Sequence, residues 1–183
     1  MFKALLSRQI AKVEKQWGYD ASYMRALLAA APVSFMKFSL LPSLVDRKAA
    51  PAEALAAAGI VGTLAEDCGP CTQIGVDMAA ASGVKPDVLR AILAGDEPAM
   101  GEAAALAWRF ARASLARDME IADPLRDEIV RRWGDKGLVA VSLSLMTSRM
   151  YPTLKYALGY GKACSKVVVA GVAAPVAPLA QAA

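Results

Sequence analysis

Residues 66–73 read Glu66-Asp67-Cys68-Gly69-Pro70-Cys71-Thr72-Gln73, which puts a Cys-x-x-Cys pair where a helix is expected to begin. Two cysteines three residues apart lie on one face of a helix, close enough to form a disulfide. Backbone amides at a helix N-terminus lower the pKa of a nearby thiol, and the thiolate is the reactive form. Asp67 is the expected N-cap, and Pro70 fits the first turn. The pair is therefore a candidate reactive site.

The sequence on both sides of this motif has the apolar spacing of helices. Apolar residues recur every three to four positions between Phe2 and Trp17, and Gly18 ends that segment. Proline or a capping residue is expected to begin later helices, and glycine to end them. The expected starts are Asp20 or Ser22, Pro32, Pro51, Pro86 and Asp123-Pro124, and the expected stops are Gly83, Gly95 and Gly134.

An all-α fold follows from this pattern. No alternation with a period of two is long enough to predict a strand, and Val167-Val168-Val169 is the only run of β-branched residues. The last long apolar segment runs from Leu138 to Tyr160, with a kink expected at Pro152. We expect a single domain over residues 1–165 and a flexible apolar tail over 166–183.

The composition narrows the function classes. Hydrophobic residues make up 56% of the 183 residues, and this apolar excess suggests a surface covered by another subunit. The net charge of +4 is modest and the basic residues are dispersed, so nucleic-acid binding is not expected. The longest uncharged run, residues 167–183, is too short to span a membrane, and residues 1–20 lack the apolar region of a signal peptide. A cytoplasmic location is therefore expected.

In the cytoplasm a Cys-x-x-Cys pair is more often catalytic or metal-binding than structural. A structural zinc site needs four ligands, but Cys164 is the only further cysteine and the chain has no histidine. No metal site is therefore expected, and no haem, flavin or nicotinamide motif implies another cofactor. A thioredoxin fold is disfavoured because no aromatic residue precedes Cys68 and no alternation of strands and helices surrounds it.

The order of elements around the motif resembles a different family. The motif is followed by Gly83, by an acidic turn at Asp96-Glu97-Pro98, by an alanine-rich segment and by a further apolar helix. Over roughly residues 50–165 this order is similar to that of the AhpD-like superfamily, which holds the alkylhydroperoxidases and the carboxymuconolactone decarboxylases. The resemblance implies a helical bundle intertwined in a homo-oligomer (dimer, trimer or hexamer).

The resemblance also implies a reaction. Redox members of the family use a Cys-x-x-Cys dithiol that reduces a hydroperoxide or a protein disulfide and is then reduced by a dithiol donor. By this resemblance Cys71 is the attacking thiol, and Cys68 resolves the sulfenic acid or mixed disulfide. Geometry by itself does not decide which cysteine attacks.

The chain departs from the family pattern at the proton relay. Redox members carry a histidine four residues after the second cysteine, where this chain has Gly75, and a glutamate upstream, where it has Ala56, Ala57 and Ala58. Glu66 is the best substitute base, because a protonated and partly buried carboxyl group can exchange a proton with the thiol. The alternative is that Glu66 complements the helix dipole.

Two further functions stay open. The missing histidine favours a protein similar to the carboxymuconolactone decarboxylases that binds a small ligand and has inert cysteines. A purely structural or interaction subunit is the third possibility, supported by the apolar excess. Thr72 and Gln73 are secondary candidates to orient a substrate or water, although surface polar residues on a helix are commoner. Arg149, Tyr151 and Tyr156 are secondary candidates for the lining of a pocket, although aromatic packing is the more ordinary explanation.

Overall fold

Helices account for most of the structure, so the all-α class is confirmed. The computed structural model describes residues 2–161 and 166–177. The helices are α1 (Phe2–Trp17), α2 (Ser22–Ala30), α3 (Pro32–Phe38), the 3₁₀ helix η1 (Leu41–Leu44), α4 (Ala52–Ala65), α5 (Gly69–Ala81), α6 (Pro86–Ala94), α7 (Glu97–Met100), α8 (Glu102–Ala116) and α9 (Met119–Ala157). Within the described ranges, no helix combines the length and apolarity that a membrane crossing requires.

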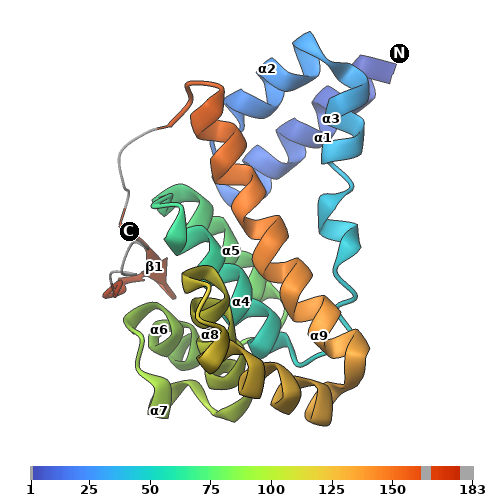
Figure 1. Cartoon of the computed structure of the whole chain (residues 1–183). Helices are drawn as coiled ribbons and strands as arrows, with labels where there is room; N and C mark the ends of the chain where they lie inside the picture. Colours follow the sequence, from blue (N-terminus) through green and yellow to red (C-terminus); the bar gives the residue numbers. More distant parts are fainter. Residues whose placement is uncertain (1, 162–165, 178–183) are drawn as a thin grey trace.

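Helix α4 lies at the centre of the molecule (Figure 1). It packs against α5, α8 and α9, and Ala54, Ala57, Ala58 and Gly62 are buried among them. These contacts belong to a large hydrophobic core that also includes α6, α7 and part of the C-terminal segment. Helix α4 has almost no polar face, and a helix of this kind lies in the interior of a protein.

Helices α1, α2 and α3 form a second hydrophobic cluster at one end of the molecule (Figure 1). Its buried side chains include Ile10, Tyr19, Tyr23 and Phe35. Ile74 of α5 and Leu154 of α9 pack against it. The N-terminal helices thus cover part of α5 and the C-terminal part of α9, and a cavity lies between them and α4.

Helix α9 begins earlier than the sequence predicted. Arg117 takes a left-handed conformation (φ 57°) that ends α8, and the Asp118 side chain accepts a hydrogen bond from the Ile121 amide at 3.2 Å. The predicted start at Asp123-Pro124 is therefore wrong, because Asp118 already caps the helix and Pro124 falls in its second turn. The predicted break at Gly134 is confirmed, since its φ of 68° and ψ of −179° interrupt the helical geometry.

The C-terminal segment contains a pair of strands that the sequence did not predict. Strands β1 (Val168–Val169) and β2 (Val172–Ala173) pair antiparallel, with Val168 opposite Ala173. Val167 and Val169 are buried, and the Ala177 amide donates to the Leu93 carbonyl at 2.8 Å. Where a flexible tail was expected, residues 166–177 thus form a hairpin packed on the helices; residues 178–183 lie outside the described structure.

Candidate functional site

Cys68 and Cys71 are joined by a disulfide at the start of α5. Their Cα atoms are 5.2 Å apart, which is within the usual range for a disulfide. Cys68 is the N-cap of α5, so the predicted N-cap Asp67 is one residue too early. Both cysteines are buried, with exposed fractions of 3% and 2%. A reactant therefore has to approach the sulfurs through a cavity.

The short connection between α4 and α5 holds the cysteines in place. Asp67 has a positive φ of 48°, and its carbonyl accepts a hydrogen bond from the Tyr156 hydroxyl of α9 at 2.8 Å. The Thr72 amide and hydroxyl both donate to the Cys68 carbonyl, at 2.8 and 3.1 Å. The turn is thus fixed from both sides, and Thr72 has a structural contact here.

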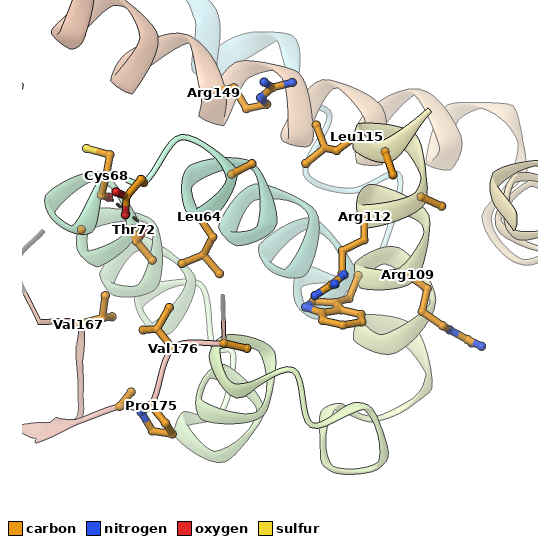
Figure 2. A pocket seen from close by; sticks show the side chains of 18 of the residues that line it. Leu64, Cys68, Thr72, Arg109, Arg112, Leu115, Arg149, Val167, Pro175 and Val176 are labelled. Atoms are coloured by element: carbon orange, nitrogen blue, oxygen red, sulfur yellow. Dashed lines mark hydrogen bonds between the residues drawn. The ribbon is translucent and has the colours of Figure 1, made fainter. Parts of the chain in front are cut away.

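Cys68 lines a pocket of about 1430 Å³ between α5, α8 and the C-terminal segment (Figure 2). Arg109 and Arg112 of α8 lie across the pocket from Cys68, and Arg149 and Lys166 also line it. The Arg112 guanidinium lies over the Trp108 ring, 4.5 Å from its centroid. Basic side chains outnumber acidic ones in this lining, although Arg109 and Arg149 are paired with Glu97 and Glu66.

Cys71 lines a different cavity, of about 630 Å³, on the other side of the motif. This cavity lies between the N-terminal helices and α4, α5 and α9, and apolar side chains such as Ile10, Phe35 and Ile60 make up much of its wall. Its volume falls in the range of small-molecule sites. The hydroxyl groups of tyrosines 19, 23 and 151 are its notable polar features near the cysteine.

Tyr19 is the tyrosine that contacts the cysteine. Its Oη atom is 3.7 Å from Cys71 Sγ and donates to Tyr23 Oη at 3.4 Å. The two rings pack edge to face, with centroids 6.4 Å apart, and the buried Lys155 ammonium lies 5.3 Å from the centroid of the Tyr19 ring. Burial raises the pKa of Tyr19, and the hydrogen bond with Tyr23 offsets part of this effect. Tyr19 is therefore a neutral phenol at physiological pH.

Burial likewise raises the pKa of Tyr23 and raises the pKa of Tyr151 to about 12. Tyr151 packs edge to face on Phe38, with ring centroids 5.0 Å apart. The cavity therefore presents hydroxyl groups rather than phenolates to anything that enters it.

Glu66, the predicted substitute base, is positioned for a different interaction. Its Oε1 atom accepts hydrogen bonds from the Arg149 guanidinium, at 2.7 Å from Nε and 2.5 Å from Nη2, and Oε2 accepts from Thr153 at 3.2 Å. In the part of the chain that the structure describes, no hydrogen bond joins Glu66 to either cysteine. The structure thus brings Cys68 and Cys71 together and connects Glu66 to α9 instead.

Of the remaining candidate residues, some line the cavity of Cys71 and others make contacts away from the cysteines. The Gln73 side chain accepts from the Val168 amide at 2.7 Å and donates to the Val168 carbonyl at 3.0 Å, so it pairs with β1 like the edge of a strand. Tyr151 and Gly75 line the cavity of Cys71. Cys164 lies outside the described residues. Among the residues that are described, no group of three or more Cys, Asp and Glu side chains is arranged to hold a metal ion.

Sequence reasoning missed Tyr19 and Lys155. Tyr19 lies in the turn between α1 and α2, 52 residues before Cys71, and Lys155 lies near the end of α9. The only local signal was the spacing of Tyr19 and Tyr23, four residues apart beside a helix start. Comparison with known proteins adds nothing to this geometry: no family model, no curated protein and no solved structure matches the chain.

Proposed function

We propose that the chain is a thiol-dependent oxidoreductase of the AhpD-like kind, which reduces a hydroperoxide or a protein disulfide with the Cys68–Cys71 pair. The observation that carries this proposal is the disulfide at the start of α5, whose two cysteines line separate pockets. Structural disulfides are rare in the cytoplasm, where the chain is proposed to act, whereas redox-active ones occur there.

The two pockets support a division of labour between the cysteines. Cys71 lines the apolar cavity and has a hydroxyl group beside its sulfur, which supports its role as the attacking thiol. Attack on a peroxide yields a sulfenic acid at Cys71, and the Cys68 thiol condenses with it to form the disulfide and water. Cys68 lines the larger, basic pocket, so a dithiol donor is proposed to regenerate the pair from that side.

Thiol accounting by intact mass tests the proposal. The fully reduced protein is exposed briefly to stoichiometric cumene hydroperoxide, quenched with an alkylating agent and digested. We expect rapid loss of two hydrogens, assigned to Cys68 and Cys71 and reversed by dithiothreitol. Cysteines that stay reduced, or that oxidise slowly and without preference, would contradict the proposed function.

Single-cysteine variants test the assignment of roles. In Cys68→Ser we expect a sulfenic acid at Cys71 that a dimedone-type reagent traps, because the resolving thiol is absent. In Cys71→Ser we expect no rapid oxidation of Cys68. The reverse pattern would keep the reaction and exchange the roles of the two cysteines.

The apolar cavity also favours a second candidate function. A wall built mainly from aliphatic and aromatic side chains, with a few hydroxyl groups, is typical of sites for small apolar ligands. A ligand-binding protein with inert cysteines would show this cavity equally well. Unreactive thiols in the mass experiment, together with tight binding of an apolar fluorescent probe that Tyr23→Trp weakens, would favour this candidate.

We also propose that the chain forms a homo-oligomer, as the resemblance implies. Several large apolar side chains of α9 are exposed, among them Val139, Met146 and Met150. Exposed apolar surface is more common at interfaces than on monomers where such side chains gather on one face. A single sedimenting species with the mass of one chain, over a range of concentrations, would rule the oligomer out.

A further inference from the structure

The mechanism proposed above lacks a group that moves protons at Cys71. The chain contains no histidine, and Glu66 is hydrogen-bonded to Arg149 and Thr153. Reduction of a hydroperoxide needs such a group, because the alkoxide that leaves when the O–O bond breaks is a strong base. The atoms around Cys71 Sγ therefore have to supply the proton.

Tyr19 meets the geometric requirement. Its Oη atom lies 3.7 Å from Cys71 Sγ, within reach of a hydrogen bond to sulfur, and both residues line the same cavity. A substrate that reaches the sulfur through this cavity thus also reaches the hydroxyl. A tyrosine hydroxyl has one hydrogen to donate and lone pairs to accept another, so it can receive a proton and release one in the same step.

The surroundings of Tyr19 fix its orientation. Gly18, with a φ of 58°, ends α1 and turns the chain, and Tyr19 is buried with an exposed fraction of 6%. Tyr23 accepts its hydrogen bond and packs against its ring, while Lys155 lies over the ring. In the oxidised protein the Tyr19 hydrogen has two acceptors in reach, Tyr23 Oη and Cys71 Sγ, so rotation about one bond redirects it.

We propose that Tyr19 is a catalytic residue that relays the proton of the Cys71 thiol to the leaving alkoxide of an organic hydroperoxide bound in the apolar cavity. This inference rests on the proposed function and assigns its substrate to a class with an uncharged, apolar body. The basic pocket at Cys68 is left to the reductant.

Oxidation of Cys71 by the hydroperoxide balances in atoms and electrons. Cys71 Sγ attacks the outer oxygen of ROOH, the S–O bond forms and the O–O bond breaks. The thiol proton passes to Tyr19 Oη, and the Tyr19 hydroxyl proton passes to the inner oxygen, which leaves as the alcohol ROH. Two electrons from the sulfur reduce the peroxide, and Tyr19 ends as a neutral phenol. The Cys68 thiol then attacks the sulfenic sulfur and releases water, which gives the disulfide present in the structure.

Two oxidants with different leaving groups test this role. Cumene hydroperoxide releases a basic alkoxide that needs a proton, whereas 3-chloroperbenzoic acid, a molecule of similar size, releases a carboxylate with a pKa near 4 that needs none. In Tyr19→Phe we expect the oxidation of reduced protein by cumene hydroperoxide to slow by about 100-fold, a typical contribution of general acid–base catalysis. Oxidation by the peracid is expected to slow much less, because only the transfer of the thiol proton is then affected.

Matched variants separate this role from packing. Tyr23→Phe removes the partner of Tyr19, and we expect a smaller slowing with the same dependence on the oxidant. Tyr151→Phe removes a hydroxyl from the same cavity, and no hydrogen bond with Cys71 is present for Tyr151 in the described structure, so any change in its rates should be equal for the two oxidants.

The outcomes distinguish the two proposals. Equal slowing with both oxidants in Tyr19→Phe, or no slowing with either, would overturn the relay while the wild-type reaction still supports an oxidoreductase. A wild-type protein that neither oxidant converts rapidly to the Cys68–Cys71 disulfide would overturn both. A preference of the wild type for hydrogen peroxide over cumene hydroperoxide would overturn the apolar substrate class alone.

Discussion

Gly75 is the residue at which this chain differs most clearly from the pattern of the AhpD-like family proposed for it. It lies four positions after Cys71, where redox members carry histidine, and it lines the cavity of Cys71. A Cβ atom built at Gly75 meets no other side chain or backbone atom within 4 Å. The position therefore has room for a larger side chain on the face of α5 that carries Cys71.

We predict that Gly75→His accelerates the oxidation of Cys71. An imidazole with a pKa near 6.5 would accept the thiol proton at neutral pH, and a positioned base of this kind contributes about 100-fold at the lower end of its range. The measurement is the pH profile of the rate with cumene hydroperoxide, which should gain an inflection near pH 6.5. Gly75→Ala is the control, and equal rates in the two variants would show that the histidine does not reach the sulfur.

The site could be predicted from the sequence only where its parts are close along the chain. The Cys68–Cys71 pair, and the glycine at position 75 where a histidine was looked for, follow from spacing within one helix. Tyr19 could not be predicted, because its contact with Cys71 depends on how α1 and α2 pack on α5. The interaction of Glu66 with Arg149 is equally long-range, 83 residues apart, and local reasoning placed Glu66 near the cysteines for that reason.

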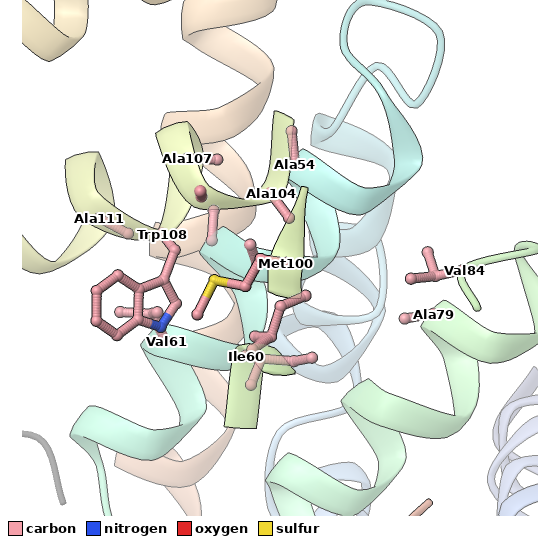
Figure 3. Close-up of a cluster of buried hydrophobic side chains, with 14 of the residues drawn as sticks. Ala54, Ile60, Val61, Ala79, Val84, Met100, Ala104, Ala107, Trp108 and Ala111 are labelled. Atoms are coloured by element: carbon pink, nitrogen blue, oxygen red, sulfur yellow. The ribbon is translucent and has the colours of Figure 1, made fainter. Parts of the chain in front are cut away.

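At the scale of elements, the close packing of α4 depends on its small residues. Ala54, Ala57 and Ala58 are fully buried, and the larger core side chains come from its partners and from its own Ile60 and Val61. Figure 3 shows Met100 of α7 among Ile60, Ala104 and Trp108. Small side chains on α4 thus let α8 and α9 approach its backbone, while Met100 and Trp108 fill the remaining space.

We predict that Gly62→Ala destabilises the protein by separating α4 from α9. The new Cβ atom would collide with Ser148 Oγ and lie 2.8 Å from the Leu145 carbonyl oxygen, which is backbone and cannot move freely. Overpacking of this kind costs about 1–3 kcal/mol of unfolding free energy, measured by urea denaturation. Gly75→Ala is the matched control: it adds the same methyl group to a helix in open space, and should stabilise by about 0.5–1 kcal/mol.

The end of a helix could be predicted from the sequence where a single glycine terminates it. Gly18 and Gly95 end their helices in the left-handed conformation that glycine adopts without strain. The same conformation at Arg117, which has a Cβ atom, gave no signal in the sequence, and the start of α9 was placed too late. The strands β1 and β2 have two residues each, too few for alternation, and β1 is also hydrogen-bonded by the Gln73 side chain of α5.

At the scale of the whole molecule, the cavity of Cys71 separates two hydrophobic clusters. The large core surrounds α4, and the smaller cluster holds α1, α2 and α3. Tyr19 and Tyr23 belong to the smaller cluster, and Tyr151 of α9 lines the same cavity. The docking of the N-terminal helices thus depends on tyrosines that are neutral in the folded protein.

This dependence predicts a loss of stability in alkali. Tyrosine in an unfolded chain ionises near pH 10, whereas burial raises the pKa of Tyr151 to about 12 and also raises the pKa values of Tyr19 and Tyr23. A group whose pKa is higher in the folded state contributes stability that is fully present below the unfolded pKa and is lost as the pH rises towards the folded pKa. The free energy of unfolding should therefore fall between pH 10 and pH 12.

Urea denaturation at pH 8, 10 and 11 measures this fall, and Tyr151→Phe should reduce it because one titrating group is gone. Phe38→Leu disturbs the same ring contact without removing a titrating group, so it should lower stability at every pH and leave the fall unchanged. An identical fall in Tyr151→Phe and Phe38→Leu would mean that Tyr151 does not link stability to pH.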